Sequence, residues 1–278
     1  MAAVYKLASR VVVWLGPVGD DSSYAFEVMS NLGSKIIVEW NLQEMKPAVA
    51  DNCDARLVDT TKPLPCRRRA QLALYRLLGR SWFERFCVRQ EISLANLDAI
   101  MMCDFDLTTW QTFSNACFCL YGKPVEEGLP KSIFDEYYGR VSTVYAMRGA
   151  TVRSVIVDLL RRSASAKCSG LSDKIFALLG MTRENIGIEP AHEKTINQVY
   201  QDFALTFFDF YHLFLLIYCD LRTHSVVMPT WVTNWTAKSL TKPINGQEAA
   251  AHSVPDIEYV CIFVGSAHAI KDDHSLLT

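Results

Sequence analysis

A carboxylate and an amide on the apolar face of one expected helix are the side chains best suited to chemistry. The segment 81–95 (SWFERFCVRQEISLA) has helical spacing, and a step of about 100° per residue places Gln90 near the centre of its apolar stripe and Glu91 at the edge. The stripe consists of Phe83, Phe86, Cys87, Gln90 and Leu94. Such polar groups need partners, because burying them unpaired costs free energy. Two interpretations stay open. In one, Glu91 is a site carboxylate positioned by Gln90; in the other, Glu91 belongs to a structural network with Arg80, Arg85 or a backbone amide.

Other motifs that would indicate chemistry are incomplete. The nine cysteines include no C-x-x-C pair, and the six histidines do not fall at zinc-ligand spacings beside them. Gly16-Pro17-Val18-Gly19 lacks the Lys-Ser/Thr of a phosphate loop, and no serine lies in G-x-S-x-G. Cys66-Arg67-Arg68-Arg69 is interpreted as a solvated charge cluster. The sequence therefore favours neither a hydrolase triad nor a metal site, and we expect no bound cofactor.

Composition sets broader limits on the class of protein. The chain has 278 residues, 50% of them hydrophobic, and a net charge of −2. This excludes general disorder and argues against an electrostatic nucleic-acid binder. The odd number of cysteines favours a reducing compartment. The longest apolar stretch, 213–219, is too short to span a bilayer. We therefore expect a cytoplasmic protein with no membrane partner.

Hydrophobic periodicity predicts an α/β region followed by a mainly helical one. The expected elements are a helix at 1–8, a strand at 11–15 buried on both faces, a helix capped by Asp20 or Asp21 and ended by Gly33, helices at 67–78 and 81–95, a strand at 99–103, and a helix capped by Thr108 or Thr109 and ended by Gly122. Residues 41–65 are expected to form a long connection. The predicted divisions are a domain at 1–123, a linker at 124–149, a helical region at 150–236, and a tail at 237–278 with a short strand at 259–264.

The clearest helix of the second half begins at Thr195. Thr195 and Gln198 have the spacing of a capping box, and the aromatic stripe that follows is interpreted as core. The stripe comprises Ile196, Val199, Tyr200, Phe203, Ala204, Phe207, Phe210, Tyr211 and Phe214.

Three stretches in combination resemble one family. VVVWLGP (11–17), RSWFERFCVRQEISLA (80–95) and SDKIFALLGM (172–181) are similar to segments of the heterokaryon-incompatibility (HET) domain proteins of filamentous fungi. INQVYQDFA (196–204) and MPTWVTNW (228–235) resemble segments that follow that domain. The resemblance implies a role in non-self recognition and programmed cell death, through protein partners of an incompatibility system. Trp14, Gly16, Asp173 and Lys174 are the family-motif positions.

The chain departs from the family pattern at several positions. Ser81, Cys87 and Ser172 stand where proline, tryptophan and arginine are usual, and the segment that family members carry before the first helix is not in the sequence. We therefore expect a truncated C-terminal part of the domain. A strand at 11–15 without its usual neighbour would leave an open sheet edge, which predicts self-association.

The family resemblance extends by analogy to the Toll/interleukin-receptor-like (TIR) fold. It implies a partial TIR-like parallel sheet with flanking helices, with Glu91 as the catalytic position of an NAD-cleaving enzyme. There, one carboxylate would stabilise a ribosyl cation as nicotinamide leaves. Gln90, Arg85 and Trp82 are the binding or supporting candidates. Two hypotheses remain open: a signalling module without complete catalytic machinery, which we favour, and an NAD-cleaving cell-death effector.

Overall fold

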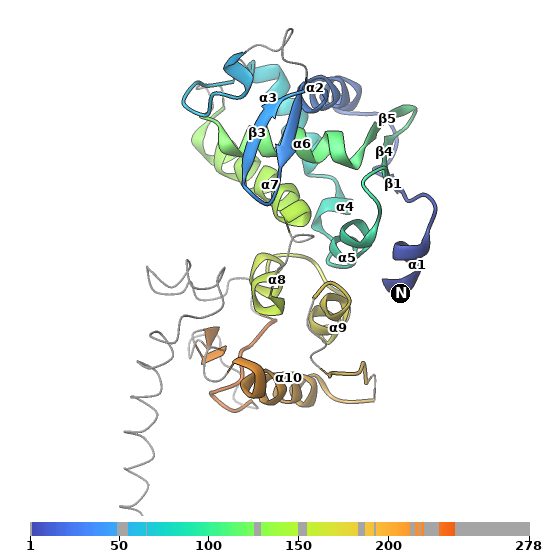
Figure 1. Cartoon of the computed structure of the whole chain (residues 1–278), viewed down its shortest axis with the longest axis vertical. Helices are drawn as coiled ribbons and strands as arrows, with labels where there is room; N and C mark the ends of the chain where they lie inside the picture. Colours follow the sequence, from blue (N-terminus) through green and yellow to red (C-terminus); the bar gives the residue numbers. More distant parts are fainter. Residues whose placement is uncertain are drawn as a thin grey trace, which may run out of the picture. The chain divides into compact units, whose positions relative to one another are not determined.

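The computed structural model describes residues 2–48, 55–64, 66–124, 129–149, 155–182, 187–191, 193–211, 215–216, 218–219 and 228–236. The chain divides into two compact units, Met1–Arg153 and Ser154–Thr278 (Figure 1). Among the described residues, no helix combines the length and the apolar character needed to cross a membrane.

Unit 1 is built on a mixed sheet of three strands in the order β1-β4-β5. β1 (Val12–Trp14) pairs in parallel with β4 (Ile100–Cys103), and β4 pairs in antiparallel with β5 (Asp106–Thr109). The expected strands at 11–15 and 99–103 are confirmed, but an entirely parallel sheet is wrong, since β5 returns directly after β4. The burial of β1 on both faces is also wrong, because Val12 and Trp14 are each 52% exposed and only Val13 is buried.

Two long helices pack on the covered face of this sheet. α2 (Ser22–Ser34) and α6 (Trp110–Gly122) contact β5, and α6 also contacts β4. The helices approach one another so closely that a Cβ on Gly33 would lie 1.9 Å from the carbonyl oxygen of Thr112. Gly33 was expected to end α2, but the helix continues to Ser34, and glycine is needed for the contact with α6. Thr109 caps α6 as predicted, accepting a hydrogen bond from the Thr112 N–H at 3.1 Å.

The prediction that an aspartate side chain caps α2 through a hydrogen bond is wrong. Asp21 occupies the N-cap position in a left-handed conformation, with φ of 61°, and its side chain makes no capping hydrogen bond. Its carboxylate instead pairs with Arg69. Between α2 and α3 (Arg68–Leu78) the expected long connection contains a hairpin, β2 (Ile36–Glu39) with β3 (Glu44–Pro47), and a 3₁₀ turn, η1 (Ala55–Leu57).

Most of the segment expected as a linker forms a helix of unit 1. α7 (Lys131–Gly149) buries Tyr137, Val141, Val144 and Met147 in the same core as the sheet. It also packs on α3 (Arg68–Leu78), where the Arg140 guanidinium lies 3.9 Å from the centre of the Tyr75 ring. These buried side chains recur every three or four residues, so one side of α7 faces the core, and the chain divides after Arg153 rather than near residue 123.

The predicted helix at 81–95 is two helices. α4 (Ser81–Glu84) and α5 (Cys87–Leu94) are separated at Arg85, which has an extended conformation with ψ of 140°. α1 (Ala2–Leu7) packs against α5. The predicted helix at the start of the chain is therefore confirmed, and it covers the helix that carries Glu91.

Unit 2 is helical where it is described. It contains α8 (Ile156–Arg162), α9 (Asp173–Leu179) and α10 (Ile196–Tyr211). The capping box is confirmed, because Gln198 Oε1 accepts from the Thr195 N–H at 2.9 Å and Thr195 Oγ1 accepts from the Gln198 N–H at 3.4 Å. The stripe of α10 is core at Val199, Tyr200, Phe203, Ala204 and Phe207, all buried. The predicted strand at 259–264 and Phe214 lie outside the described residues.

Candidate functional site

The carboxyl ends of β1 and β4 lie at one edge of the sheet, because the two strands are parallel. Arg80 links the ends of these two strands. Its Nη1 donates to the carbonyl oxygen of Leu15 at 2.8 Å and lies 3.1 Å from Cys103 Sγ. The Asp104 N–H donates to the Gly16 carbonyl oxygen at 3.1 Å. Gly16 has a φ of 103°, in the region that favours glycine. Gly16 therefore turns the chain from β1 into the loop before α2.

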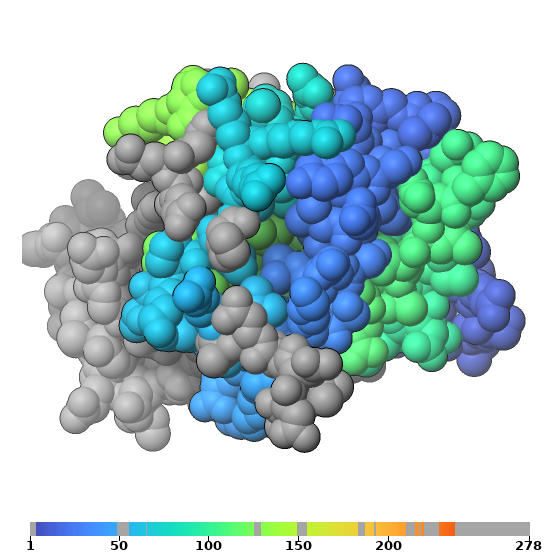
Figure 2. Space-filling view, turned by 90° about the horizontal axis from the view of Figure 1, so that it is seen from above, coloured from blue at the N-terminus to red at the C-terminus, as the bar shows by residue number. Residues whose placement is uncertain are grey.

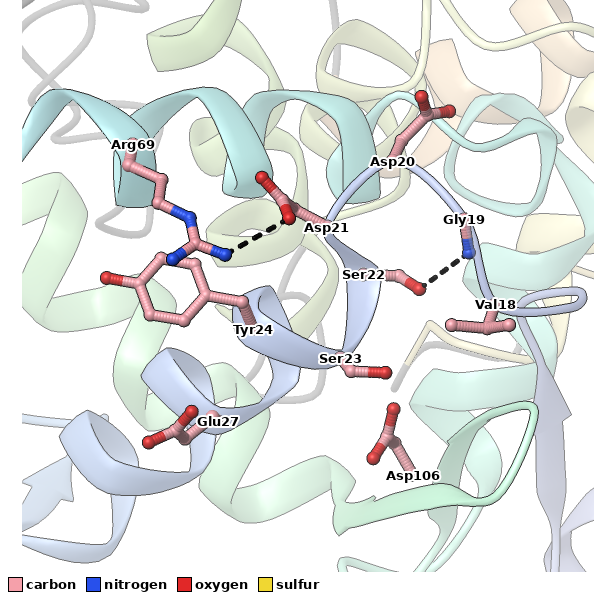
Figure 3. Close-up of a pocket in the computed structure, with 10 residues that line it drawn as sticks. All are labelled: Val18, Gly19, Asp20, Asp21, Ser22, Ser23, Tyr24, Glu27, Arg69 and Asp106. Atoms are coloured by element: carbon pink, nitrogen blue, oxygen red, sulfur yellow. Dashed lines mark hydrogen bonds and ion pairs between the residues drawn. The ribbon is translucent and has the colours of Figure 1, made fainter.

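This loop forms one wall of an open polar pocket of about 800 Å³ (Figure 3). The lining residues are Val18, Gly19, Asp20, Asp21, Ser22, Ser23, Tyr24, Glu27, Arg69 and Asp106. The Asp21 carboxylate accepts from Arg69 Nη2 at 3.2 Å, and the guanidinium lies 4.4 Å from the centre of the Tyr24 ring. The Gly19 N–H donates to Ser22 Oγ at 3.1 Å.

The pocket is acidic. Asp20, Asp21, Glu27 and Asp106 contribute carboxylates, and Arg69 is the one cation in its lining. Among the described residues, no group of three or more His, Cys, Asp or Glu side chains has the arrangement of a metal site. The Ser22 side chain is buried and its oxygen accepts from the Gly19 N–H, which is a structural role at the start of α2. The arrangement is suited to attracting a cationic group.

A second, apolar hollow of about 380 Å³ lies between α2 and α3, with Leu120 of α6 among its lining residues. Figure 2 shows it between the blue atoms of α2 and the cyan atoms of α3 and the segment before it. Its lining includes Cys66, and burial raises the pKa of that thiol to about 11. A thiol with so high a pKa is a poor nucleophile at neutral pH.

The structure gives Glu91 a tyrosine neighbour. Burial raises the pKa of the Tyr5 phenol, and the Glu91 carboxylate raises it further through its charge and a hydrogen bond. Arg85 opposes this shift, so its cationic group also lies near Tyr5. The carboxylate is half-buried between α1 and α5. Arg80, an expected partner of Glu91, instead binds the end of β1.

The other candidate residues of this segment lie in different environments. Arg85 Nη2 lies 3.6 Å from Cys87 Sγ on an exposed surface. Gln90 is buried, with 8% of its surface exposed. Trp82 belongs to the core and meets Phe83 edge to face, with ring centres 5.0 Å apart. The structure therefore brings Glu91 and Arg85 together beside Tyr5, and it places Trp82 in the packing of the sheet.

Two basic side chains that the sequence analysis did not single out are buried in unit 1. Arg89 on α5 is 5% exposed, and burial lowers its pKa to about 10. Lys123, at the end of α6, donates from Nζ to the carbonyl oxygens of Arg56 and Asp59 at 2.6 and 2.5 Å. The sequence does not predict that either side chain is buried, since arginine and lysine are ordinarily exposed.

The family-motif positions lie in both units. Trp14 and Gly16 lie at the end of β1 in unit 1, whereas Asp173 and Lys174 begin α9 in unit 2. Lys174 is buried, and its Nζ donates to the Ala164 carbonyl oxygen at 3.1 Å. Burial lowers the pKa of this amine. The contact ties the start of α9 to the segment after α8, which is a structural role.

The chain is similar to heterokaryon incompatibility protein 6, OR allele, of Neurospora crassa. The two are 24% identical over 238 residues, an alignment that covers 73% of this chain and 35% of the relative. The chain therefore spans about a third of the length of this curated relative. No family model and no solved structure matches the chain. The similarity agrees with the resemblance of the three sequence stretches to fungal incompatibility proteins.

Proposed function

We propose that this chain acts in fungal non-self recognition, as a protein-interaction module of a heterokaryon-incompatibility system. The observation that carries the proposal is the similarity to the Neurospora incompatibility protein, which extends over 73% of the chain. The folding of two motif stretches supports it. VVVWLGP contains β1 and its exit loop, and SDKIFALLGM contains α9.

The positions of the candidate residues support a module rather than a catalyst. Glu91 lies beside Tyr5, Arg80 donates to the Leu15 carbonyl oxygen, and Lys174 donates to the Ala164 carbonyl oxygen. Each of these groups stabilises the fold in the place where it lies. The exposed apolar residues of the sheet, in contrast, are available for contact with another protein.

Incompatibility activity tests the proposal directly. The chain is expressed from an inducible promoter in Neurospora crassa recipients that carry the OR allele and in recipients that lack it. We expect growth arrest and uptake of a vital dye in one class of recipient and normal growth in the other, because non-self recognition depends on the allele. Equal growth of both classes at matched protein levels would contradict the proposal. A Met101→Asp chain, with a charge in the buried core, serves as the inactive control.

The NAD-cleaving alternative depends on a single carboxylate, and the half-buried position of Glu91 beside Tyr5 and Arg85 is the observation that keeps it testable. Nicotinamide release from NAD is measured with the purified chain, with Glu91→Gln and with the exposed control Asp98→Asn. Our proposal expects no release from any of the three. Release that Glu91→Gln abolishes and Asp98→Asn preserves would establish the enzyme instead.

A further inference from the structure

One side of α2 lines both hollows of unit 1. The residues of α2 and its C-cap that line the apolar hollow have the spacing i, i+3, i+4, i+7, i+8 and i+11, which places them on one side of the helix: Tyr24, Glu27, Val28, Asn31, Leu32 and Lys35. Tyr24 and Glu27 also line the acidic pocket, so the two hollows adjoin. We call them together the α2–α3 groove. A helix rises about 1.5 Å per residue, so the 13 residues of α2 give this groove a length of about 20 Å.

The apolar hollow is a place where the core of unit 1 opens to solvent (Figure 2). Leu64 and Leu120 in its lining are buried, whereas Val28, Leu32 and Leu57 are half-buried and pack on the same core. The volume of about 380 Å³ lies in the range of ligand pockets, about 300 to 1,000 Å³. Apolar groups of another molecule that cover these half-buried side chains would therefore stabilise a complex.

The acidic pocket at the other end retains carboxylates that no cation neutralises. Asp21 is paired with Arg69, and the charge of Glu27 also acts on that guanidinium. Asp20 and Asp106 line the same pocket, and their carboxylates form no ion pair or hydrogen bond with the described residues. In Figure 3 the Asp21 side chain points to Arg69, while those of Asp20 and Asp106 lie apart from it. This end of the groove can therefore accept a cationic side chain.

We propose that the α2–α3 groove binds an amphipathic helix of a partner protein, with apolar side chains in the hollow and a lysine or arginine over Asp20 and Asp106. An amphipathic helix places its apolar face in such a groove through anchors at i, i+3, i+4 and i+7. A small apolar molecule would fill the hollow but leave the acidic end without a partner, whereas about four turns of helix span the whole groove.

The charges at the two ends of the groove fix the direction of the bound helix. The exposed basic residues Lys35 and Arg67 line the apolar hollow, away from Asp20 and Asp106. A reversed helix would bring its basic residue to these two cations, and like charges in contact oppose binding. The inference rests on the proposed role as an interaction module, for which it names the surface and the chemistry of the partner.

A pair of synthetic peptides of opposite charge tests the groove. Both have about 14 residues, the length that spans it, with leucines at i, i+3, i+4 and i+7 and a side-chain cross-link that holds them helical. One ends in two lysines and the other in two glutamates. Fluorescence anisotropy with the full chain should show at least about tenfold tighter binding of the lysine peptide at low salt. This preference should narrow at high salt, because exposed charges are screened.

Variants with matched controls locate the binding. Leu32→Asp should weaken binding of the lysine peptide by at least about tenfold, while Leu97→Asp, at an exposed leucine outside the groove, should leave it unchanged. Asp20→Asn combined with Asp106→Asn should remove the preference for the lysine peptide. Asp98→Asn, at an exposed carboxylate outside the groove, should retain the preference.

Methyl NMR of the unmodified chain gives a readout that needs no variant. The methyl signals of Val28, Leu32 and Leu57 should shift on titration with the lysine peptide, while those of Leu107 stay in place. Equal affinity for the two peptides at low salt, or binding that shifts none of the three groove residues, would overturn the proposal. So would the absence of binding by either peptide. Allele-dependent growth arrest in that last case would refute the groove and leave the role in incompatibility standing.

Discussion

The two faces of the sheet in unit 1 are both apolar, yet they have different environments. On one face, Val13, Met101 and Cys103 are at most 5% exposed beneath α2 and α6. On the other, Val12, Trp14 and Leu107 are each more than half exposed. Apolar character alone therefore does not identify the core of this sheet. The covered face supplies stability through burial, whereas the other face gains from apolar contact only when a second molecule covers it.

The largest effect is expected from truncating the centre of the covered face. Met101 is fully buried, and Met101→Ala should lower the free energy of unfolding of unit 1 by about 2 to 5 kcal/mol, because it removes buried methylene groups and leaves a cavity. Native-state hydrogen exchange of the α6 amides reports this free energy for the unit that contains the sheet. Met102→Ala, at the next residue and half-buried on the other face, is the matched control, and it should cost less than about 1 kcal/mol. Equal losses would contradict a difference between the faces.

A second test acts on the helices that cover this face. A Cβ at Gly33 would lie 1.9 Å from the Thr112 carbonyl oxygen, so Gly33→Ala should push α2 away from α6 and cost about 1 to 3 kcal/mol. The sign is informative, because helix propensity alone would make the same change stabilising by about 0.5 to 1 kcal/mol. Gly19→Ala is the matched control, since no atom lies within 4 Å of its added Cβ. The free energy of unfolding is again measured by hydrogen exchange of the α6 amides. A gain in stability for Gly33→Ala would show that the helices are not in close contact.

Strong local signals predicted the elements that the structure confirms. The capping box of Thr195 and Gln198 and the N-cap Thr109 are local hydrogen-bonding patterns. The strand at 99–103 is likewise predicted by a short run of apolar residues that are consecutive in the sequence. β5 and the β2–β3 hairpin were missed for a physical reason. Their turns use Asp104 and Gln43 in left-handed conformations, with φ of 53° and 57°, where the sequence offers no glycine as a signal.

The candidate site was predicted only in part, because its contacts join distant segments. Spacing identified Glu91 as a polar residue that needs a partner, but it could not identify Tyr5 of α1 as that partner. Arg80 was among the expected partners of Glu91, and it binds the Leu15 carbonyl oxygen instead. The position of Arg85 between α4 and α5 depends on a break in the helix that the apolar periodicity does not reveal.

A smaller effect on stability is expected at the N-terminus of α6, one of the two helices that cover the sheet. Thr109 ends β5 and caps α6, and Thr109→Ala should cost about 1 kcal/mol by leaving the Thr112 N–H without its acceptor. Thr109→Ser retains a hydroxyl oxygen and should restore most of this loss. The exchange rates of the first-turn amides of α6 measure the change locally. No difference between the alanine and serine variants would mean that the cap does not stabilise the helix.

The smallest effect is expected on the uncovered face, at Leu107. Leu107→Thr removes an apolar side chain that is 57% exposed and introduces a β-branched residue suited to a strand, so the loss of apolar contact is the main change. The free energy of unfolding, measured by exchange of the α6 amides in dilute monomer, should change by no more than about 0.5 kcal/mol. A loss close to that of Met101→Ala would mean that Leu107 is covered within the monomer. The contrast between the two faces would then disappear.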